Sequence, residues 1–197
     1  GAAVTGVDIS DVAINFARQL SADSGIVANF ERADVFDWLA EAAAQGKSFD
    51  VVFSSYGALI WLSELREWAA GVTQVLKPGG RLAISDIALR KELPAHVAQE
   101  MSAWTGCIGG ALTIEDNREK LLRAGFTDVA IQDAQADLNA YRAGGAAACC
   151  GPSTSCCSPS EEPQETNFHD QMSALLDTID ANEYAASVKI FALKPEA

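Results

Sequence analysis

The chain is short of basic residues and of long apolar runs, and each shortage excludes a class of function. It has 14 Lys and Arg against 27 Asp and Glu, a formal net charge of −13, which repels nucleic-acid phosphates and anionic lipid surfaces. No apolar run reaches the roughly 18 residues of a membrane span, and no basic start leads into an apolar stretch as in a signal peptide. We therefore expect a cytoplasmic protein that acts on a small molecule, without a nucleic-acid or membrane partner.

Histidine is also scarce. The only two histidines are His96 and His169, and neither lies in a recognisable motif. We expect both to be surface or partly packed residues, so chemistry that depends on a histidine general base is not expected. The sequence opens at Gly1 without an initiator methionine, and we expect a segment upstream to be missing.

Cysteine, by contrast, is concentrated in one place. Four of the five cysteines lie in the stretch "CCGPSTSCC", residues 149–157. The candidates for this cluster are a disulfide knot, a zinc site, a site for a softer metal or metalloid, and no function at all. Reducing cytosol disfavours the knot, and two adjacent Cys-Cys pairs do not have the C-x2-C spacing typical of zinc. The surrounding residues 143–167 predict a low-complexity loop that could bind soft metals incidentally.

Strands and helices are expected to alternate along most of the chain. An alternation of this length predicts an α/β fold, with a parallel sheet covered by helices on both faces. Ser10 is a predicted helix cap, Thr113 and Asp116 form a variant capping box, and Gly125 ends that helix. Expected strands span 2–9, 26–35 (with a loop), 49–57, 81–89, 127–134 and 186–194; expected helices span 11–20, 36–46, 65–76, part of 91–112, 113–125 and 168–180.

Four stretches, "VTGVDIS", "ERADVFD", "FDVVFSSYGALIWL" and "LKPGGRLAISD", together resemble the class I S-adenosylmethionine-dependent methyltransferases over residues 1–90. The resemblance implies a Rossmann-like sheet that binds S-adenosylmethionine outside the carboxyl ends of its strands. Asp8, followed by Ile9, would bind the ribose hydroxyls, Asp34 and Val35 would contact the adenine, and Ser54 would lie beside the methyl group. Each has a plainer alternative: a helix cap for Asp8, a solvated loop acid for Asp34, and a strand end for Ser54.

Two further parts of the chain resemble arsenite methyltransferases. They are the stretch from "RLAISDIALRKELPAHVAQEMSAWTGCIGGAL" through "LLRAGFTDV" and the ending "EYAASVKIFALKPE". In that family the cysteine of the "GCIGGAL" turn binds trivalent arsenic, and here it is Cys107. Soft thiolates suit a thiophilic ion. In that family a cysteine-bearing segment further along supplies another thiolate, and here "CCGPSTSCC" lies in that place. Adjacent cysteines in extended chain point to opposite sides, so one of each pair can face inward. The resemblance therefore implies that Cys149 or Cys150 joins Cys107, with Cys156 and Cys157 as capturing or spare thiols.

The resemblance implies methylation of thiolate-bound arsenite by S-adenosylmethionine, with a thiol reductant. Two alternatives remain open: a methyltransferase for another small molecule, which "SSYGALIWL" resembles more closely, and a thiol-rich metal binder without catalysis. The first strand and glycine-rich turn of the family are expected to be missing, and the last strand is expected to be antiparallel. Residues 1–90 would form part of the donor-binding region, and residues 91–197, with the loop 143–167, would complete the same domain on the acceptor side.

Overall fold

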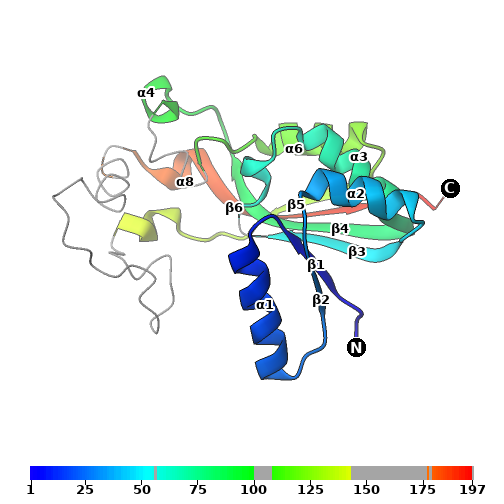
Figure 1. Ribbon diagram of the computed structural model, residues 1–197. Helices are drawn as coiled ribbons and strands as arrows, with labels where there is room; N and C mark the ends of the chain where they lie inside the picture. Colours follow the sequence, from blue (N-terminus) through cyan, green and yellow to red (C-terminus); the bar gives the residue numbers. More distant parts are fainter. Residues whose placement is uncertain (56, 100–107, 143–176, 178, 197) are drawn as a thin grey trace, which may run out of the picture.

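The computed structural model describes all residues except 56, 100–107, 143–176, 178 and 197 (Figure 1). No helix in the described part is long and apolar enough to cross a membrane. The elements, in chain order, are β1 (Thr5–Asp8), α1 (Asp11–Ser24), β2 (Asn29–Arg32), α2 (Val35–Ala44), β3 (Phe49–Ser55), η1 (Leu59–Trp61), α3 (Leu65–Val75), β4 (Leu76–Leu89), α4 (Ala95–Ala98), α6 (Ile114–Arg123), β5 (Thr127–Asp133), η2 (Leu138–Arg142), α8 (Ala181–Tyr184) and β6 (Ala185–Leu193).

The strands form two separate sheets. β1 and β2 make a parallel pair, and the other four strands lie in the order β3-β4-β6-β5. β3 and β4 are parallel, whereas β6 runs antiparallel to both β4 and β5. The expected α/β fold with an antiparallel last strand is thus confirmed. Among the described residues no ladder joins β1 to β3, as expected if the strand that the family places between them is absent.

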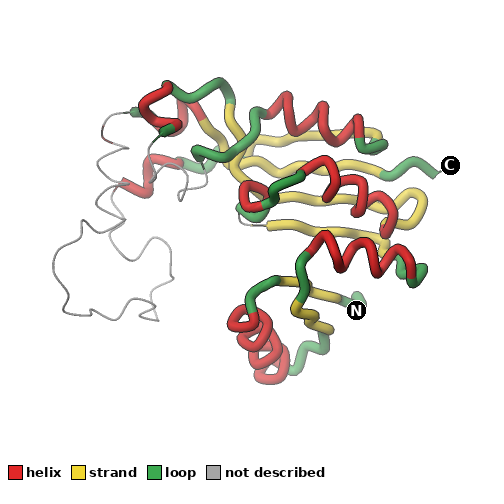
Figure 2. The backbone as a smooth tube through the Cα atoms, turned by 45° about the horizontal axis from the view of Figure 1, so that its top comes forward, coloured by secondary structure: helices red, strands yellow, loops and turns green. Residues whose placement is uncertain are grey.

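Three helices, α2, α3 and α6, cover one face of the four-stranded sheet (Figures 1 and 2). The main core lies between this face and the helices: Val72 and Val75 of α3 pack with Leu82 of β4 and Val188 of β6, all fully buried. In β4 the even-numbered residues from Leu82 to Ala88 are buried, whereas the odd-numbered residues from Arg81 to Ile87 are not. Side chains alternate across a strand, so the odd-numbered residues lie on the opposite face of the sheet.

The apolar side of α1 is not covered. Val12, Phe16 and Leu20 recur every four residues, as the sequence pattern indicates, yet all three are exposed, and Ile14 is the buried residue of the helix. α1 packs on β2 through Arg18, whose guanidinium donates a hydrogen bond to the Phe30 carbonyl at 2.7 Å. In Figure 1, α1 lies on the opposite side of the four-stranded sheet from α2, α3 and α6. The helix was therefore predicted correctly, but its apolar side lacks a partner among the described residues.

Both predicted caps are present. The Ser10 hydroxyl accepts a hydrogen bond from the Ala13 amide at the start of α1, and the Thr113 hydroxyl accepts one from the Asp116 amide at the start of α6. The Thr113 hydroxyl also donates to the Asp116 carboxylate, which completes the variant capping box. Gly125, with φ of 93°, follows the end of α6 as expected, because a positive φ favours glycine.

The "KPGG" segment is a correction to the sequence analysis. It was expected to end a helix that includes Leu76, but α3 ends at Val75, and Leu76 already pairs with Phe49 as the first residue of β4. The glycines lie inside that strand: Gly79 has φ of 69° and its amide donates to the Lys194 carbonyl. The ladder shifts register between Phe49 and Val51, so the glycines form an irregularity within a strand and not a break before it.

Trp38 of α2 links the two sheets. Its indole N–H donates a hydrogen bond of 2.7 Å to the Glu31 carboxylate on β2, and its ring packs on Phe49 of β3 with centroids 5.9 Å apart. Lys47 adds an ion pair to Glu31 at 3.9 Å. One aromatic side chain thus contacts both the two-stranded and the four-stranded sheet.

Between β4 and α6 the structure describes one short helix, α4, and a turn, so the expected helix within 91–112 is only partly described. Most of the expected helix 168–180 and the whole loop 143–167 lie outside the described residues. His96 is exposed, as expected, and His169 is not described.

Candidate functional site

Asp8, the predicted ribose ligand, ends β1 and is exposed. Its Oδ1 accepts a hydrogen bond of 2.7 Å from the Ser10 amide, so Asp8 also supports the turn before α1. In the described part of the chain, its Oδ2 has no hydrogen-bond partner. The N-cap of α1 is Ser10, so Asp8 supports the cap residue but is not itself the helix cap. Its second oxygen remains available to accept from a hydroxyl group.

Asp34, the predicted adenine ligand, is the N-cap of α2 and is also exposed. Its Oδ1 accepts from the Phe36 amide at 2.8 Å, whereas the structure gives Oδ2 no partner among the described residues. The following Val35 packs against the main core. Asp34 thus has the same arrangement as Asp8: one oxygen accepts from a backbone amide, and the other has no partner in the described part of the chain.

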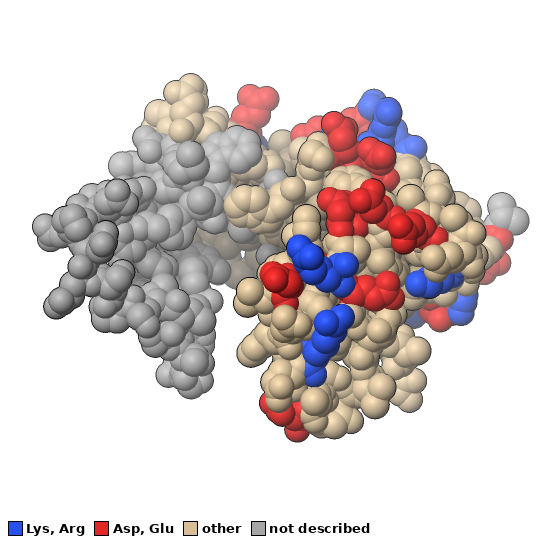
Figure 3. Space-filling model, in the orientation of Figure 1, with Lys and Arg blue, Asp and Glu red and all other residues tan. Residues whose placement is uncertain are grey.

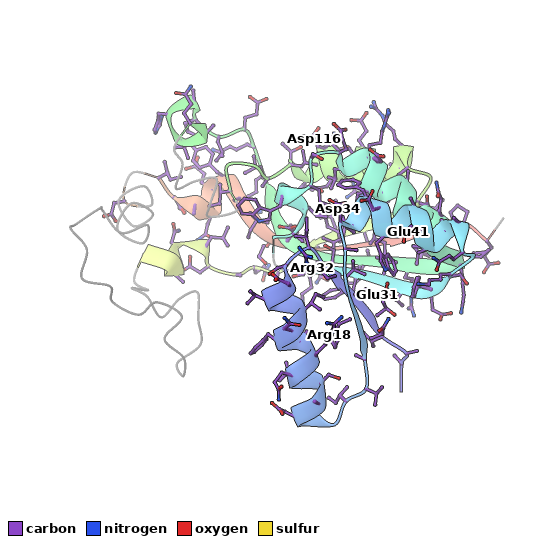
Figure 4. The ribbon with its side chains drawn as sticks, in the orientation of Figure 1. Arg18, Glu31, Arg32, Asp34, Glu41 and Asp116 are labelled. Atoms are coloured by element: carbon purple, nitrogen blue, oxygen red, sulfur yellow. The ribbon has the colours of Figure 1, made fainter. Side chains whose placement is uncertain are left out.

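Backbone contacts bring the carboxyl ends of β1 and β2 together. The Asp8 carbonyl accepts from the Ala33 amide at 3.0 Å, and the Arg32 guanidinium donates to the Ile9 carbonyl at 3.2 Å. Asp34 follows directly, and Figure 4 shows it near Arg32 at the top of the two-stranded sheet. The predicted donor residues Asp8, Ile9, Asp34 and Val35 therefore meet at one end of this sheet, the end where ligands bind in open α/β folds.

Ser54 lies near the carboxyl end of β3, half-buried, opposite Ile84 of β4. Its position at a strand end agrees with the expectation, and its side chain has no hydrogen-bond partner among the described residues. In Figure 1 the carboxyl ends of β1 and β3 lie toward the same side of the molecule. Ser54 and the two aspartates therefore share that side.

Asp86 was missed by the sequence analysis. It lies on β4 with only 7% of its surface exposed. One carboxylate oxygen accepts from the Leu59 amide at 3.2 Å and the other from the Ile87 amide at 2.7 Å. Burial raises the pKa of this carboxyl, because removal from water penalises its charged form, and the two amide donors oppose that shift. The sequence feature that could have revealed Asp86 is an acidic residue inside the apolar run "RLAISDIAL". The alternation of side chains along a strand places this acid on the same face as the buried Leu82 and Ile84.

Asp86 holds the turn after β3 in place. Its bond to Leu59 fixes η1, the segment that follows Ser54 and Ser55. A cavity of about 20 Å³ adjoins the carboxylate and is lined also by Gly110, Leu112 and Asn117, and such a volume has room for one water molecule. The cavity beside the buried acid therefore lies between η1 and the turn that follows Cys107.

The turn Ile108–Leu112 is anchored to the end of β4. The Ala111 amide donates to the Ile108 carbonyl at 3.2 Å, and the Leu89 amide donates to the Leu112 carbonyl at 2.9 Å. Ile108 and Ala111 are buried beside Leu89. Although Cys107 itself is not described, the residue that follows it is thus held at the carboxyl end of β4.

The predicted arsenic ligands Cys107, Cys149, Cys150, Cys156 and Cys157 all lie outside the described residues. Their arrangement stays a prediction. Among the described residues there is no group of three or more His, Cys, Asp or Glu side chains that could hold a metal ion. Acidic side chains gather instead over α2, α3 and α6, on the helix-covered side (Figure 3).

Comparisons with known proteins agree on the family. The family model for the methyltransferase domain matches residues 1–137. Among curated proteins, the arsenite methyltransferase of Mus musculus is 29% identical over 119 residues, which are 57% of this chain and 31% of that protein. That of Halobacterium salinarum is 43% identical over 58 residues, 29% of this chain and 15% of that protein. The chain thus spans a third or less of the length of these two relatives.

Solved structures show the same fold at low sequence identity. An arsenic(III) S-adenosylmethionine methyltransferase from Chlamydomonas reinhardtii superposes with a TM-score of 0.62 at 19% identity, over 98% of this chain and 55% of that one. A phosphoethanolamine N-methyltransferase from Haemonchus contortus, in complex with S-adenosyl-L-methionine, gives a TM-score of 0.63 at 15% identity, over 98% and 43% of the two chains. The fold of all three chains is that of the class I methyltransferases.

Proposed function

The chain belongs to the methyltransferase domain family, and from this premise we propose that it methylates thiolate-bound trivalent arsenic with S-adenosylmethionine as the methyl donor. The observation that carries the proposal is the anchoring of the turn after Cys107 to the carboxyl end of β4. Ser54 lies on the neighbouring parallel strand, paired with Ile84, so both strands run toward this end of the sheet. A cysteine at that turn would present arsenic to a donor bound at the strand ends.

The residues present fit the donor. Asp8 and Asp34 each accept from a backbone amide with one carboxylate oxygen. The other oxygen would accept from ribose hydroxyls at Asp8 and from the adenine amino group at Asp34. Charged acceptors of this kind form the stronger hydrogen bonds. The apolar Ile9 and Val35 adjoin these acids and would cover ring surfaces. When bound, the donor supplies an electrophilic methyl group on a sulfonium.

The chain's own residues would do little acid–base work. Arsenic held by Cys107 would supply the lone pair that bonds to the methyl carbon, and the sulfur of the donor would leave with the electron pair of the broken carbon–sulfur bond. Catalysis then depends mainly on alignment of the two reactants. Arsenic passes from the trivalent to the pentavalent state, so two electrons from a thiol reductant must restore it before a further methylation.

The first test is calorimetric titration of S-adenosylmethionine into the purified chain under a thiol reductant. We expect Asp8→Asn and Asp34→Asn to weaken binding by roughly tenfold or more, the value of a hydrogen bond to a charged group. Asparagine keeps the oxygen that caps the backbone, so both variants should fold. Asp37→Asn is the matched control, an exposed acid in the first turn of the same helix. Equal affinities in all three variants would contradict the donor site.

The second test addresses the acceptor. Cys107→Ser should lower arsenite affinity and abolish arsenic methylation while donor affinity stays unchanged, which separates the two half-sites. Arsenite affinity unaffected by Cys107→Ser would contradict the arsenic assignment. Methyl transfer to another small molecule that survives deletion of residues 146–160 would favour a different acceptor. Arsenite binding without any donor binding would indicate a sequestering protein.

A further inference from the structure

Two buried side chains interrupt the apolar interior of the described part of the chain. They are Asp86 of β4 and Asn117 of α6, which are 7% and 6% exposed, and every other buried side chain there is apolar. Both line the cavity of about 20 Å³ between η1 and the turn Ile108–Leu112. Asp86 points to the face of the sheet that α3 and α6 cover (Figure 1). Two polar groups from elements far apart in the sequence therefore meet in one place.

Asp86 holds the chain where it leaves the sheet on the donor side. The ladder between β3 and β4 ends at the pair Ser55–Ser85, and Asp86 is the next residue of β4. One of its oxygens accepts from the Leu59 amide of η1 at 3.2 Å. Among the residues that the structure describes, no other hydrogen bond joins η1 to the sheet. Beyond the last pair of the ladder, a side chain thus replaces the backbone in holding η1.

Asn117 holds the end of the acceptor turn. Its side-chain nitrogen donates to the Thr113 carbonyl at 3.0 Å and to the Leu112 carbonyl at 3.4 Å. The Leu112 carbonyl also accepts from the Leu89 amide at the end of β4. The turn that follows Cys107 is therefore held by α6 on one side and by β4 on the other.

Stability alone does not account for a carboxyl group at this place. Apart from Asn117, the residues that line the cavity with Asp86 are apolar or glycine. Burial raises the pKa of Asp86, and only the two amide donors oppose that shift. Well-packed apolar side chains are often at least as stabilising as a buried ionisable group. A buried acid that the fold does not require is a candidate for a functional role.

We infer that Asp86 and Asn117 act together as positioning residues for methyl transfer, by holding η1 and the turn Ile108–Leu112 at a fixed separation. The inference rests on the proposed function, because it concerns the alignment of the donor's methyl group with arsenic at Cys107. Both side chains are buried, so neither would touch a reactant. Their contribution would appear in the rate of transfer, which is sensitive to small misplacements, and not in the affinity for either ligand.

The experiment compares Asp86→Asn and Asn117→Ala with the wild type. Single-turnover transfer of a labelled methyl group from S-adenosylmethionine to arsenite, with both ligands saturating, measures the rate of transfer. Calorimetry in a monothiol reductant measures the affinity for each ligand separately. We expect each variant to transfer the methyl group roughly a hundredfold more slowly. Both affinities should stay within about threefold of the wild type, since only the aligned state is impaired.

Lys194→Met is the matched control for loss of stability. The Lys194 ammonium donates to the Thr73 and Leu76 carbonyls, where β4 begins, whereas Asp86 lies toward the other end of that strand. The control therefore weakens the same core without a contact to η1 or to the acceptor turn. At a temperature where circular dichroism shows all variants folded, Lys194→Met should transfer the methyl group at the wild-type rate.

A double variant tests whether the two residues form one unit. Losses at independent sites multiply, whereas residues of one unit give losses that do not. We expect Asp86→Asn with Asn117→Ala to be about as slow as the slower single variant. Amide exchange adds a measurement independent of activity. Protection of the Leu59 amide should fall roughly tenfold in Asp86→Asn, because asparagine presents an N–H group in place of one acceptor oxygen, and it should not change in Lys194→Met.

Three outcomes would overturn the inference alone. The first is single variants that transfer the methyl group as fast as Lys194→Met. The second is a slower rate accompanied by an equal loss of affinity for S-adenosylmethionine, since the residues would then support donor binding. The third is a double variant whose loss equals the product of the two single losses. A wild-type chain that binds both ligands and transfers no methyl group would contradict the proposed function, and the inference with it.

Discussion

Ile14 and Phe16 lie two residues apart on α1 but face different surroundings, which allows a matched test of the fold. Ile14 is 3% exposed and Phe16 is 70% exposed. Truncation of a buried isoleucine to alanine costs about 2–5 kcal/mol. Truncation of an exposed phenylalanine should stay within about 0.5 kcal/mol, and alanine's higher helix propensity even favours the change. The sequence pattern alone would rank the two in the opposite order, since Phe16 belongs to the apolar repeat.

Amide hydrogen exchange resolved along α1 is the suitable assay, because the two-stranded sheet can open without unfolding of the rest. Ile14→Ala should lower the protection of α1 amides by roughly thirtyfold or more, the equivalent of 2 kcal/mol. Phe16→Ala should change it by less than about threefold. Amides of β4 serve as an internal control. An equal loss of protection in both variants would refute the reasoning and show that Phe16 is packed in solution.

Three further predictions concern buried or capping contacts. Asp86→Asn should lower the free energy of unfolding by about 1–3 kcal/mol, since the amide offers one acceptor oxygen to two backbone donors. The raised pKa of Asp86 makes the stability of the wild type fall as pH rises above 3.8. The difference in unfolding free energy between wild type and variant, measured in urea, should therefore narrow from acidic to neutral pH. Thr113→Ala should lower the free energy of unfolding by about 1 kcal/mol through loss of the α6 cap. Thr113→Ser should keep the cap and the wild-type stability. Lys194→Met should lower the free energy of unfolding, measured by calorimetry, by about 1–3 kcal/mol, because the ammonium donates to the Thr73 and Leu76 carbonyls at 2.6 Å. Lys194→Arg should lower it less.

Local signals in the sequence were reliable where one residue determines one contact. Ser10 and Thr113 cap helices because their hydroxyls reach backbone amides a few residues on, whatever the rest of the chain does. The strand positions also followed from short apolar runs between polar ones. Leu76 shows the limit: it continues the helical repeat of α3, but pairing with Phe49 outweighs that preference.

Burial was harder to predict because it depends on partners far along the chain. The repeat of Val12, Phe16 and Leu20 correctly indicated a helix, but periodicity does not say what lies against its apolar side. Asp86 shows the converse: a carboxylate within an apolar strand became a buried acceptor for the distant Leu59 amide. The donor residues Asp8 and Asp34 were located by resemblance, and their dual contacts only by the structure.

The division of the sheet has a mechanical consequence for the proposed reaction. Asp8 ends β1 of the two-stranded sheet, whereas Asp34 caps α2, which packs on the four-stranded sheet. Ser54 and the turn after Cys107 also belong to the four-stranded part. In the proposed site the methyl donor would therefore span both sheets, with its ribose at Asp8 and its methyl group beside Ser54, on the same sheet as the acceptor turn. Trp38 contacts both sheets, so its contacts would help to fix the distance between these two parts of the proposed site. A displacement of about 1 Å between these two parts can slow a reaction a hundredfold, even where the affinity for each ligand is unchanged.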